Sequence, residues 1–258
     1  MATVLYPSPV FGPVRSRRLG VSLGINLMPA DGKVCTFDCI YCECGFNADR
    51  RPRVGRPSRG EVAAGLEAQL RRMAAEGVLP DVLTFAGNGE PTAHPEFAAI
   101  VEDVLGLRDR YCPAARVSVL SNGTRAHLPE VHEALLRVDC NILKLDTVDA
   151  DYVERVCRPA GRYDVERVVD TLCGFGGRVI VQTMFMCGEY GGRSVDNTGA
   201  EFVGPWLAAL RRIRPQQVMV YTIDRETPAA GLRKASPARL DGIAELVRAE
   251  GIPVSVSY

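Results

Sequence analysis

Short apolar segments alternate with amphipathic segments along almost the whole of this sequence, and this alternation restricts the fold more than any other feature. The apolar segments are rich in Val, Ile and Leu without strict alternation, which is typical of strands buried on both faces of a parallel sheet. We expect strands at residues 21–27, 81–87, 115–121, 140–146, 178–186 and 216–223, with a short final strand at 253–257.

The segments between these strands carry helix signals. Ser58 and Glu61 form a capping-box pattern ahead of an apolar helical face. Pro95 stands where the first residue of the next helix is expected, and Asp164 and Ser236 are expected to cap two later helices. The sequence therefore predicts a helix after most of the strands.

Six strand–helix units in a row predict right-handed crossovers and a parallel sheet. Because the count falls short of eight, we predict an α/β fold with an open sheet, a partial (β/α)6 TIM-like barrel, instead of a closed barrel. We find no linker, repeat or low-complexity tract, and we expect a single domain over residues 1–258, with 1–20 as an irregular N-terminal extension packed on the barrel. Ligands of such sheets bind at the carboxyl ends of the strands.

Composition limits the classes of function. The formal net charge is zero, with 31 basic and 31 acidic residues, so nothing attracts nucleic acid or a membrane surface globally. No signal peptide and no apolar stretch of spanning length is recognisable, which leads us to expect a soluble protein in the cytoplasm, with no membrane partner. Nine cysteines, four of them between Cys35 and Cys44, indicate metal binding or catalysis in a reducing compartment rather than disulfides.

The cysteine run follows the first strand with the spacing C-x3-C-x2-C, formed by Cys35, Cys39 and Cys42. Three thiolates on one loop can hold three irons of a four-iron cluster, which usually takes four Cys ligands. A free fourth iron can bind a small molecule and pass it an electron. Two other interpretations stay open: a zinc site, although such sites usually pair two separated CxxC units, or unrelated buried thiols. Cys44 lies too close to Cys42 to complete the same set comfortably.

This cysteine run, with the aromatic Tyr41 before its last Cys, resembles the radical S-adenosylmethionine (radical SAM) enzymes. The wider sequence resembles a bacterial and archaeal subgroup of iron–sulfur oxidoreductases that is akin to the wyosine-forming tRNA enzymes, over residues 11–14, 16–20, 22–27 and 35–42 and on through the GNGEPT segment. The resemblance implies the radical SAM fold and one [4Fe-4S] cluster on Cys35, Cys39 and Cys42. It implies S-adenosylmethionine (SAM) on the fourth iron, with Tyr41 among the cofactor contacts. Reductive cleavage of SAM would then give a 5′-deoxyadenosyl radical that abstracts hydrogen from an unidentified substrate.

A second motif, Gly87-Asn88-Gly89-Glu90, follows the strand at 81–87. Taken alone, it is explained by a tight turn, since glycine tolerates positive φ. Radical SAM enzymes carry a Gly-Gly-Glu-like motif at this place, which receives the SAM ammonium group. The resemblance therefore assigns Asn88, Gly89 and Glu90 to SAM, with Asn88 standing where that motif often has glycine.

Polar residues at the ends of three further strands complete the expected set of cofactor contacts: Ser121, Asn122, Asp146, Gln182 and Thr183. Ser121 and Asn122 can hydrogen-bond a ribose or a carboxylate, although an Asn-Gly turn explains them equally well. Lys144 and Asp146 are charges inside an apolar run, so we expect them to line the cavity or to pair with each other.

The remaining predictions concern scattered thiols and partners. The other six cysteines are too dispersed for a second cluster, but Cys44 and Cys187 should lie near the rim. The basic segment Arg50–Arg59 is a candidate RNA-binding surface, and Arg17 and Arg18 are candidates to contact an anionic substrate. We expect RNA or peptide modification, with an electron donor such as flavodoxin or ferredoxin. The alternative is a non-catalytic iron–sulfur or zinc-binding interaction module.

Overall fold

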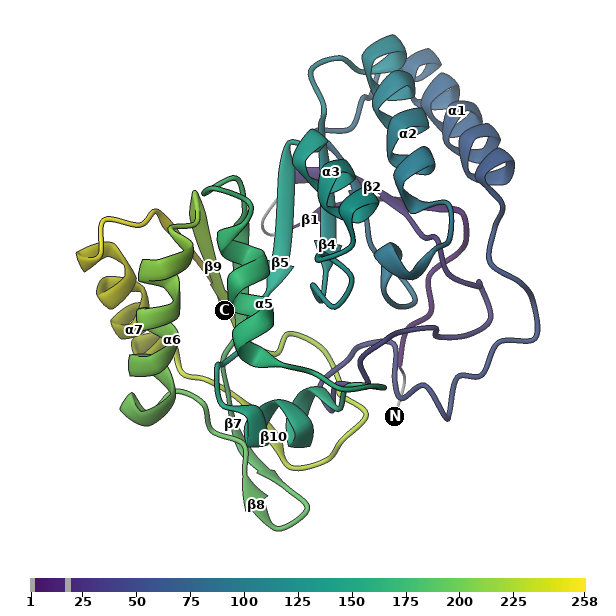
Figure 1. Cartoon of the computed structure of the whole chain (residues 1–258). Coiled ribbons are helices and arrows are strands. Elements are labelled where there is room, and N and C mark those ends of the chain that lie inside the picture. The colour runs from purple at the N-terminus through teal and green to yellow at the C-terminus, as the bar shows by residue number, and fades with distance from the viewer. Residues whose placement is uncertain (1–2, 17–19) are drawn as a thin grey trace.

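An open, curved sheet of eight strands forms the centre of the computed structural model, which describes residues 3–16 and 20–258 (Figure 1). The strand order is β1-β2-β3-β4-β5-β6-β9-β11. In that order the strands are β1 (Val10–Ser16), β2 (Gly20–Ile25), β3 (Val82–Phe85), β4 (Arg116–Ser121), β5 (Cys140–Lys144), β6 (Ile180–Met184), β9 (Gln217–Tyr221) and β11 (Val254–Ser257). Each predicted strand segment overlaps one of these strands, and the predicted open α/β sheet is confirmed.

The strands from β2 to β11 run parallel to their neighbours, whereas β1 pairs antiparallel with β2. The prediction of an irregular segment over residues 1–20 is therefore wrong for Val10–Ser16. Pro9 directly precedes this strand, and Pro13 lies within it, after Gly12, which has a positive φ. Such breakers conceal a strand from pattern reasoning, and they are tolerated because β1 is an edge strand.

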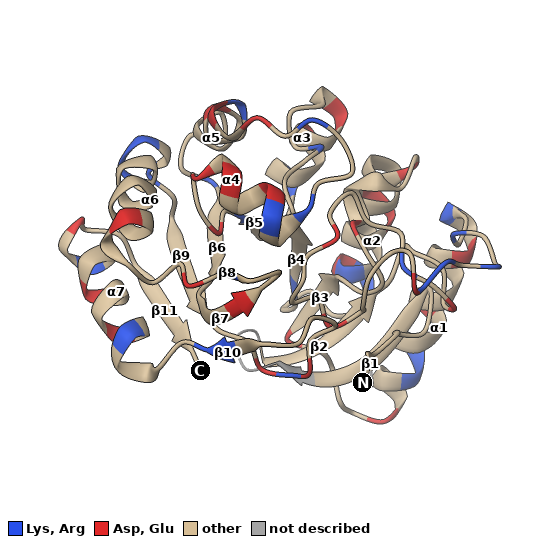
Figure 2. Cartoon of the chain, turned by 90° about the horizontal axis from the view of Figure 1, so that it is seen from below, with Lys and Arg blue, Asp and Glu red and all other residues tan. Residues whose placement is uncertain are grey.

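Helices line the outer, convex face of the sheet, as the view along the barrel shows (Figure 2). They are α1 (Arg59–Ala75), α2 (Phe97–Tyr111), α3 (Pro129–Arg137), α5 (Val165–Cys173), α6 (Ala200–Ile213) and α7 (Pro237–Ala249). At the carboxyl end of the sheet lie a 3-10 turn η1 (Pro91–Ala93), the short α4 (Ala150–Tyr152) and a π-helical turn η2 (Val153–Cys157), of which the last two pack against the cysteine loop. Alternate strand residues such as Phe85, Leu143 and Val181 pack against these helices in the main core. The opposite side chains, including Ile142 and Met219, form a smaller cluster on the inner face. Among the described residues, no helix is both long enough and apolar enough to cross a membrane.

The helix starts follow the predicted signals at three of four places. Ser58 and Glu61 make the reciprocal capping box of α1, and the side chains of Asp164 and Ser236 cap α5 and α7. The prediction for Pro95 is wrong, because α2 begins two residues later with Glu96 as its N-cap. The reason is local: the ring of His94 accepts a hydrogen bond from the Glu96 backbone N–H at 3.1 Å, which holds the preceding residues in a turn.

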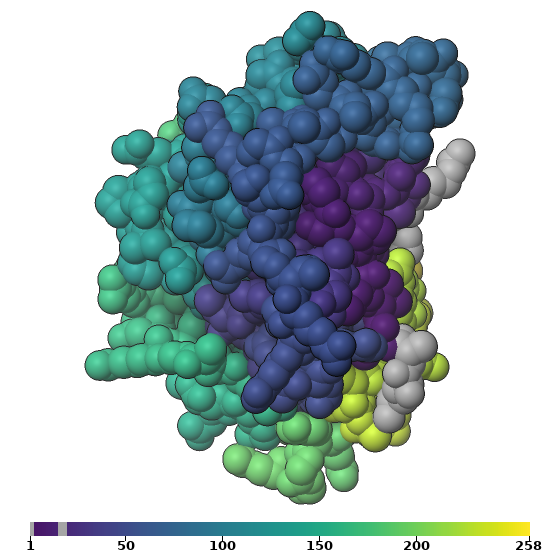
Figure 3. Space-filling view, turned by 90° about the vertical axis from the view of Figure 1, so that its right-hand side faces the viewer, coloured from purple at the N-terminus to yellow at the C-terminus, as the bar shows by residue number. Residues whose placement is uncertain are grey.

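A small second sheet extends the molecule beyond the carboxyl ends of β6 and β9. It has the order β10-β7-β8, formed by β7 (Met186–Tyr190), β8 (Arg193–Ser194) and β10 (Leu232–Lys234). The N-terminal residues lie at the surface beside the segment that follows the cysteines and beside part of the C-terminal third (Figure 3). Arg225 joins these parts by donating hydrogen bonds to Tyr6 at 2.7 Å and to Glu43 at 3.0 Å.

Candidate active site

The cysteine loop and the GNGE turn lie against each other at the carboxyl edge of the sheet. Val34, directly before the first cysteine, forms a parallel bridge with Gly89. Its backbone N–H donates to the Asn88 carbonyl at 3.0 Å, and its carbonyl accepts from the Glu90 N–H at 3.1 Å. Gly89 has a φ of +145°, and a Cβ at this position would lie 1.8 Å from the Val34 oxygen. Glycine is therefore required here for the two motifs to meet.

The three cysteines of the run share one compact loop. The Cys42 N–H donates to the Cys39 carbonyl at 3.1 Å, and Cys39 is buried while Cys35 and Cys42 are half-buried. A hydrogen bond with Cys44, helped by the Lys33 charge, lowers the pKa of the Cys42 thiol to about 6. Burial, followed by the charge of Glu90, raises the pKa of the Cys35 thiol. The loop thus offers three soft sulfur donors, whose ionised forms a bound iron favours.

Within residues 3–16 and 20–258, no group of three or more His, Cys, Asp or Glu side chains is placed to hold a single metal ion. A tetrahedral zinc site requires such convergence. A four-iron cluster makes a different demand, because each thiolate binds its own iron and the sulfurs are held apart. Three cysteines on one loop, with the buried carboxylate of Glu90 adjacent, supply the sulfur donors for three irons of such a cluster.

Glu90 lies almost fully buried, with 2% of its surface exposed. One carboxylate oxygen accepts hydrogen bonds from the Thr92 N–H at 3.0 Å, the Thr92 hydroxyl at 2.6 Å and the Ser121 hydroxyl at 2.7 Å. The other oxygen accepts from the Asn122 N–H at 2.7 Å. Burial nevertheless raises the pKa of Glu90, and none of its described contacts is an ion pair. A cation that reached this carboxylate would therefore be bound favourably.

Asn122 connects Glu90 with the cysteine loop. Its side-chain amide donates to the Thr36 hydroxyl at 2.8 Å and lies 3.7 Å from the Cys35 sulfur. The Thr36 hydroxyl in turn bonds that of Thr124 at 2.8 Å. The side chain of Ser121 thus contacts Glu90, and Asn122 contacts both Glu90 and the cysteine loop. Their contact with a ribose or carboxylate of SAM stays a prediction.

Lys144 and Asp146 at the end of β5 pair with each other, as the sequence analysis allowed. The hydroxyl of Tyr41 contacts both groups, so it joins the cysteine loop to β5. Asp146 also accepts from the Met184 N–H at 3.0 Å. With this set of protein partners, the side chain of Asp146 has a structural role that the predicted cofactor contact did not anticipate.

Two predicted cofactor contacts require correction. The side chain of Asn88 is completely buried and binds backbone groups of Tyr6 and Pro29, at distances of 2.7 to 2.8 Å. Its amide therefore anchors the N-terminal segment, and both of its N–H donors are used within the protein. Thr183 points to the helix layer, where its hydroxyl donates to the Leu145 carbonyl at 2.8 Å and accepts from the indole N–H of Trp206 at 3.2 Å.

Gln182 points the other way. It is in register with Lys144 on the inner face, and its amide donates to the Tyr221 hydroxyl at 3.0 Å. Because successive strand residues alternate between faces, Gln182 and Thr183 cannot both reach the same ligand. Gln182 therefore stays a predicted contact of SAM.

The other residues singled out in the sequence lie at several places. Cys44 lies beside Cys42, whereas Cys187 lies on β7 near Arg239. In the basic segment, the guanidinium of Arg50 donates to the Thr3 hydroxyl at 3.1 Å, and that of Arg59 pairs with Asp103. These two side chains are therefore engaged within the protein. Arg17 and Arg18 lie outside the described residues.

Sequence reasoning missed two buried neighbours of the cysteine run. The thiol of Cys157 forms a hydrogen bond with Cys39 and accepts another from the Lys144 ammonium at 3.1 Å. Lys33, two residues before Cys35, is buried beneath the loop. Its proximity to the motif was the available signal, but lysine is almost never fully buried without a partner, so pattern reasoning favours the surface.

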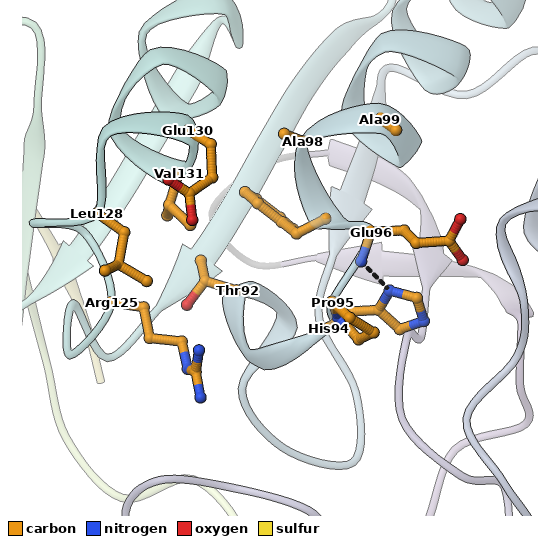
Figure 4. A pocket seen from close by; sticks show the side chains of 11 residues that line it. Thr92, His94, Pro95, Glu96, Ala98, Ala99, Arg125, Leu128, Glu130 and Val131 are labelled. Carbon is orange, nitrogen blue, oxygen red and sulfur yellow. Dashed lines mark hydrogen bonds between the residues drawn. The ribbon is translucent and has the colours of Figure 1, made fainter.

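A cavity of about 360 Å³ lies behind the Glu90 turn, between the starts of α2 and α3 (Figure 4). Thr92 and Arg125 line it, with Leu128 and Val131 on the side of α3. The hydroxyl of Thr92 donates to Glu90, so this cavity adjoins the Glu90 turn, and no cysteine among the described residues lines it.

Comparison with known proteins agrees with the geometry. Residues 31–192, more than half of the chain, match the Radical SAM superfamily. The chain belongs to this superfamily, and it is a radical SAM enzyme, whose cofactors are a [4Fe-4S] cluster and SAM.

Among individual relatives, the chain is 30% identical over 224 residues to a UPF0026 protein of Helicobacter pylori, a match that covers 85% of this chain and 67% of the relative. A radical SAM methyltransferase from Sphaerobacter thermophilus has a similar fold, with a TM-score of 0.68, 18% identity and coverage of 92% and 66%. TYW1 with a lysine-pyruvate adduct bound gives a TM-score of 0.60, 18% identity and coverage of 88% and 73%. The chain thus spans about two thirds of the length of the Helicobacter relative, and the two structures show the fold alone.

Proposed function

We propose that Cys35, Cys39 and Cys42 hold the [4Fe-4S] cluster and that SAM occupies the position left by the missing fourth ligand. When bound, this cofactor pair supplies an electron and a 5′-deoxyadenosyl radical for hydrogen abstraction from a substrate. The remaining tasks of the chain are to bind and orient the cofactors and the substrate and to exclude water from them.

The observation that supports this proposal best is the pairing of Val34 with Gly89 and Glu90. Val34, the residue directly before Cys35, is held in a strand-like pair with the Glu90 turn. The pairing therefore holds Cys35, which we propose binds one iron, close to the buried carboxylate of Glu90. SAM bound to an iron on this loop would have Glu90 as the adjacent buried carboxylate, which would favour a bound cation over a proton of its own.

Glu90 has the chemistry to recognise the SAM ammonium group. Its two oxygens accept four hydrogen bonds, three on one oxygen and one on the other, which fixes the orientation of the carboxylate. The less occupied oxygen retains an acceptor position. Gly89 places the backbone of this turn against the loop, and the half-buried Tyr41 and Gln182 remain candidates for further contacts with SAM.

The substrate class is RNA or a peptide side chain, and the structure favours neither. An RNA surface at Arg50–Arg59 receives little support, because Arg50 and Arg59 already bind within the protein. An electron donor such as flavodoxin or ferredoxin remains part of the proposal, as does a cytoplasmic location.

The proposal is tested by anaerobic reconstitution with iron and sulfide, followed by addition of SAM and dithionite. We expect broad absorption near ~400 nm, typical of Fe–S clusters, and release of 5′-deoxyadenosine. Cys39→Ala should abolish both, whereas the matched control Cys173→Ala, on the outer helix α5, should abolish neither. A colourless zinc protein, or a cluster that leaves SAM intact, would support the interaction-module alternative instead.

A further inference from the structure

Lys33 is a charged residue in a place where charge is costly. Its side chain is 1% exposed, and its ammonium donates hydrogen bonds to the Gly45 carbonyl at 2.7 Å and to Asp38 at 3.4 Å. Burying an ammonium group costs several kcal/mol unless partners compensate for the lost water. The one carboxylate in this set is incompletely available to Lys33, because Asp38 also accepts from the Asn47 N–H at 2.7 Å and lies 3.7 Å from the Arg158 guanidinium.

The buried ammonium faces the cysteine run. Its ammonium lies inside the loop that carries the run, because its acceptor Gly45 itself donates its backbone N–H to the Cys42 carbonyl at 2.9 Å, and its partner Asp38 directly precedes Cys39. Lys33 also stands only two residues before Cys35. The loop that carries the three thiols therefore encloses one cation that solvent does not screen. The backbone of Lys33 is held as well, since its N–H donates to the Arg50 carbonyl at 2.7 Å.

Other charged groups near the loop are arranged differently. Lys144, which lies near Cys39, pairs directly with Asp146, so that pair adds little net charge. Glu90 acts on Cys35 with negative charge. Lys33 thus supplies a buried positive charge whose one carboxylate partner, Asp38, is shared with Arg158 and the Asn47 N–H.

We propose that Lys33 is a positioning residue that sets the reduction potential of the cluster by stabilising its reduced, more negative form. Reduction adds one electron from an external donor to the cluster, and net charge and hydrogen bonds to the sulfurs tune the potential of such centres. A buried cation close to three thiolates raises that potential and makes the reduction easier. This inference rests on the proposed function, because it requires the cluster to be held by Cys35, Cys39 and Cys42.

The test is an EPR-monitored redox titration of reconstituted protein, with iron content measured for each variant. Lys33→Met should lower the midpoint potential by at least about 59 mV, the value that corresponds to a tenfold change in a one-electron equilibrium. Lys33→Arg, which keeps the charge, should shift it less. Asp38→Asn removes the opposing charge and should raise the potential. Arg158→Met is the matched control: it removes a cation that also contacts Asp38 but is 39% exposed, so solvent screens it and the shift should be small.

The opposite signs expected for Lys33→Met and Asp38→Asn separate an electrostatic role from a purely structural one. Loosening the loop would change both variants in the same direction, so shifts of one sign, or unchanged potentials in both, would overturn the inference. If Lys33→Met loses its iron while Lys33→Arg retains it, the charge is required even to hold the cluster, and the inference stands. If both Lys33 variants lose iron while Asp38→Asn keeps the wild-type potential, Lys33 acts only through packing. Failure of the wild-type protein to bind a cluster would refute the proposed function itself.

Discussion

The contact between Gly89 and the cysteine loop yields the sharpest prediction. In Gly89→Ala, the new methyl group would lie 1.8 Å from the Val34 oxygen, at a backbone φ of +145°. Holding a non-glycine residue in such a conformation costs about 1–3 kcal/mol. Relief of the overlap also breaks the two backbone hydrogen bonds of Val34, each contributing about 0.5–1.5 kcal/mol. We therefore expect a loss of about 2–6 kcal/mol in the free energy of unfolding.

Urea denaturation of the cluster-free protein measures this loss, and iron content after reconstitution measures its consequence for the site. Gly77→Ala is the matched control, because Gly77 also has positive φ, +72°, but a Cβ there would meet nothing within 4 Å. It should cost only about 1–2 kcal/mol and leave iron binding unchanged. The reasoning would be refuted if the two variants lost the same stability, or if Gly89→Ala bound iron as well as the wild-type protein.

Three further predictions follow from single side chains. Ser58→Ala should lower the free energy of unfolding by about 1 kcal/mol in urea denaturation without changing iron content, because it removes the capping box of α1. Asn88→Ala should cost about 2–3 kcal/mol in the same assay, since it removes the acceptor of the Tyr6 N–H and the donor to the Pro29 carbonyl, at about 1–3 kcal/mol each; a loss below ~1 kcal/mol would contradict its anchoring role. Cys44→Ala should retain the iron content of the wild-type protein, and loss of iron would show that Cys44 is a ligand.

The fold was largely predictable because its signals are local. Strands buried on both faces read as continuous apolar runs, and Ser58, Asp164 and Ser236 cap helices through contacts within a few residues. Strand β1 and the sheet of β7, β8 and β10 were missed. Their residues are interrupted by glycine and proline or lie half-exposed, and their pairing is made by distant partners that no local pattern reveals.

The site was predictable to the extent that a motif carries its own geometry. The spacing of the cysteines and the Gly89-Glu90 turn identified two segments that the structure brings together. Thr183 was misassigned because neighbouring strand residues were treated alike, although they must face opposite sides of the sheet. Asn88, Lys33 and Cys157 could not be assigned from sequence, since the role of a buried polar group depends on which distant backbone or thiol it meets.

The most direct test of the central claim is Mössbauer spectroscopy of the reconstituted, iron-57-labelled protein with and without SAM. If three cysteines hold the cluster and SAM takes the remaining position, one of the four irons should change its spectrum on addition of SAM while the other three do not. In Glu90→Gln this change should require a higher SAM concentration, because the carboxylate that receives the ammonium group has lost its charge. A cluster whose irons are all insensitive to SAM would contradict the account.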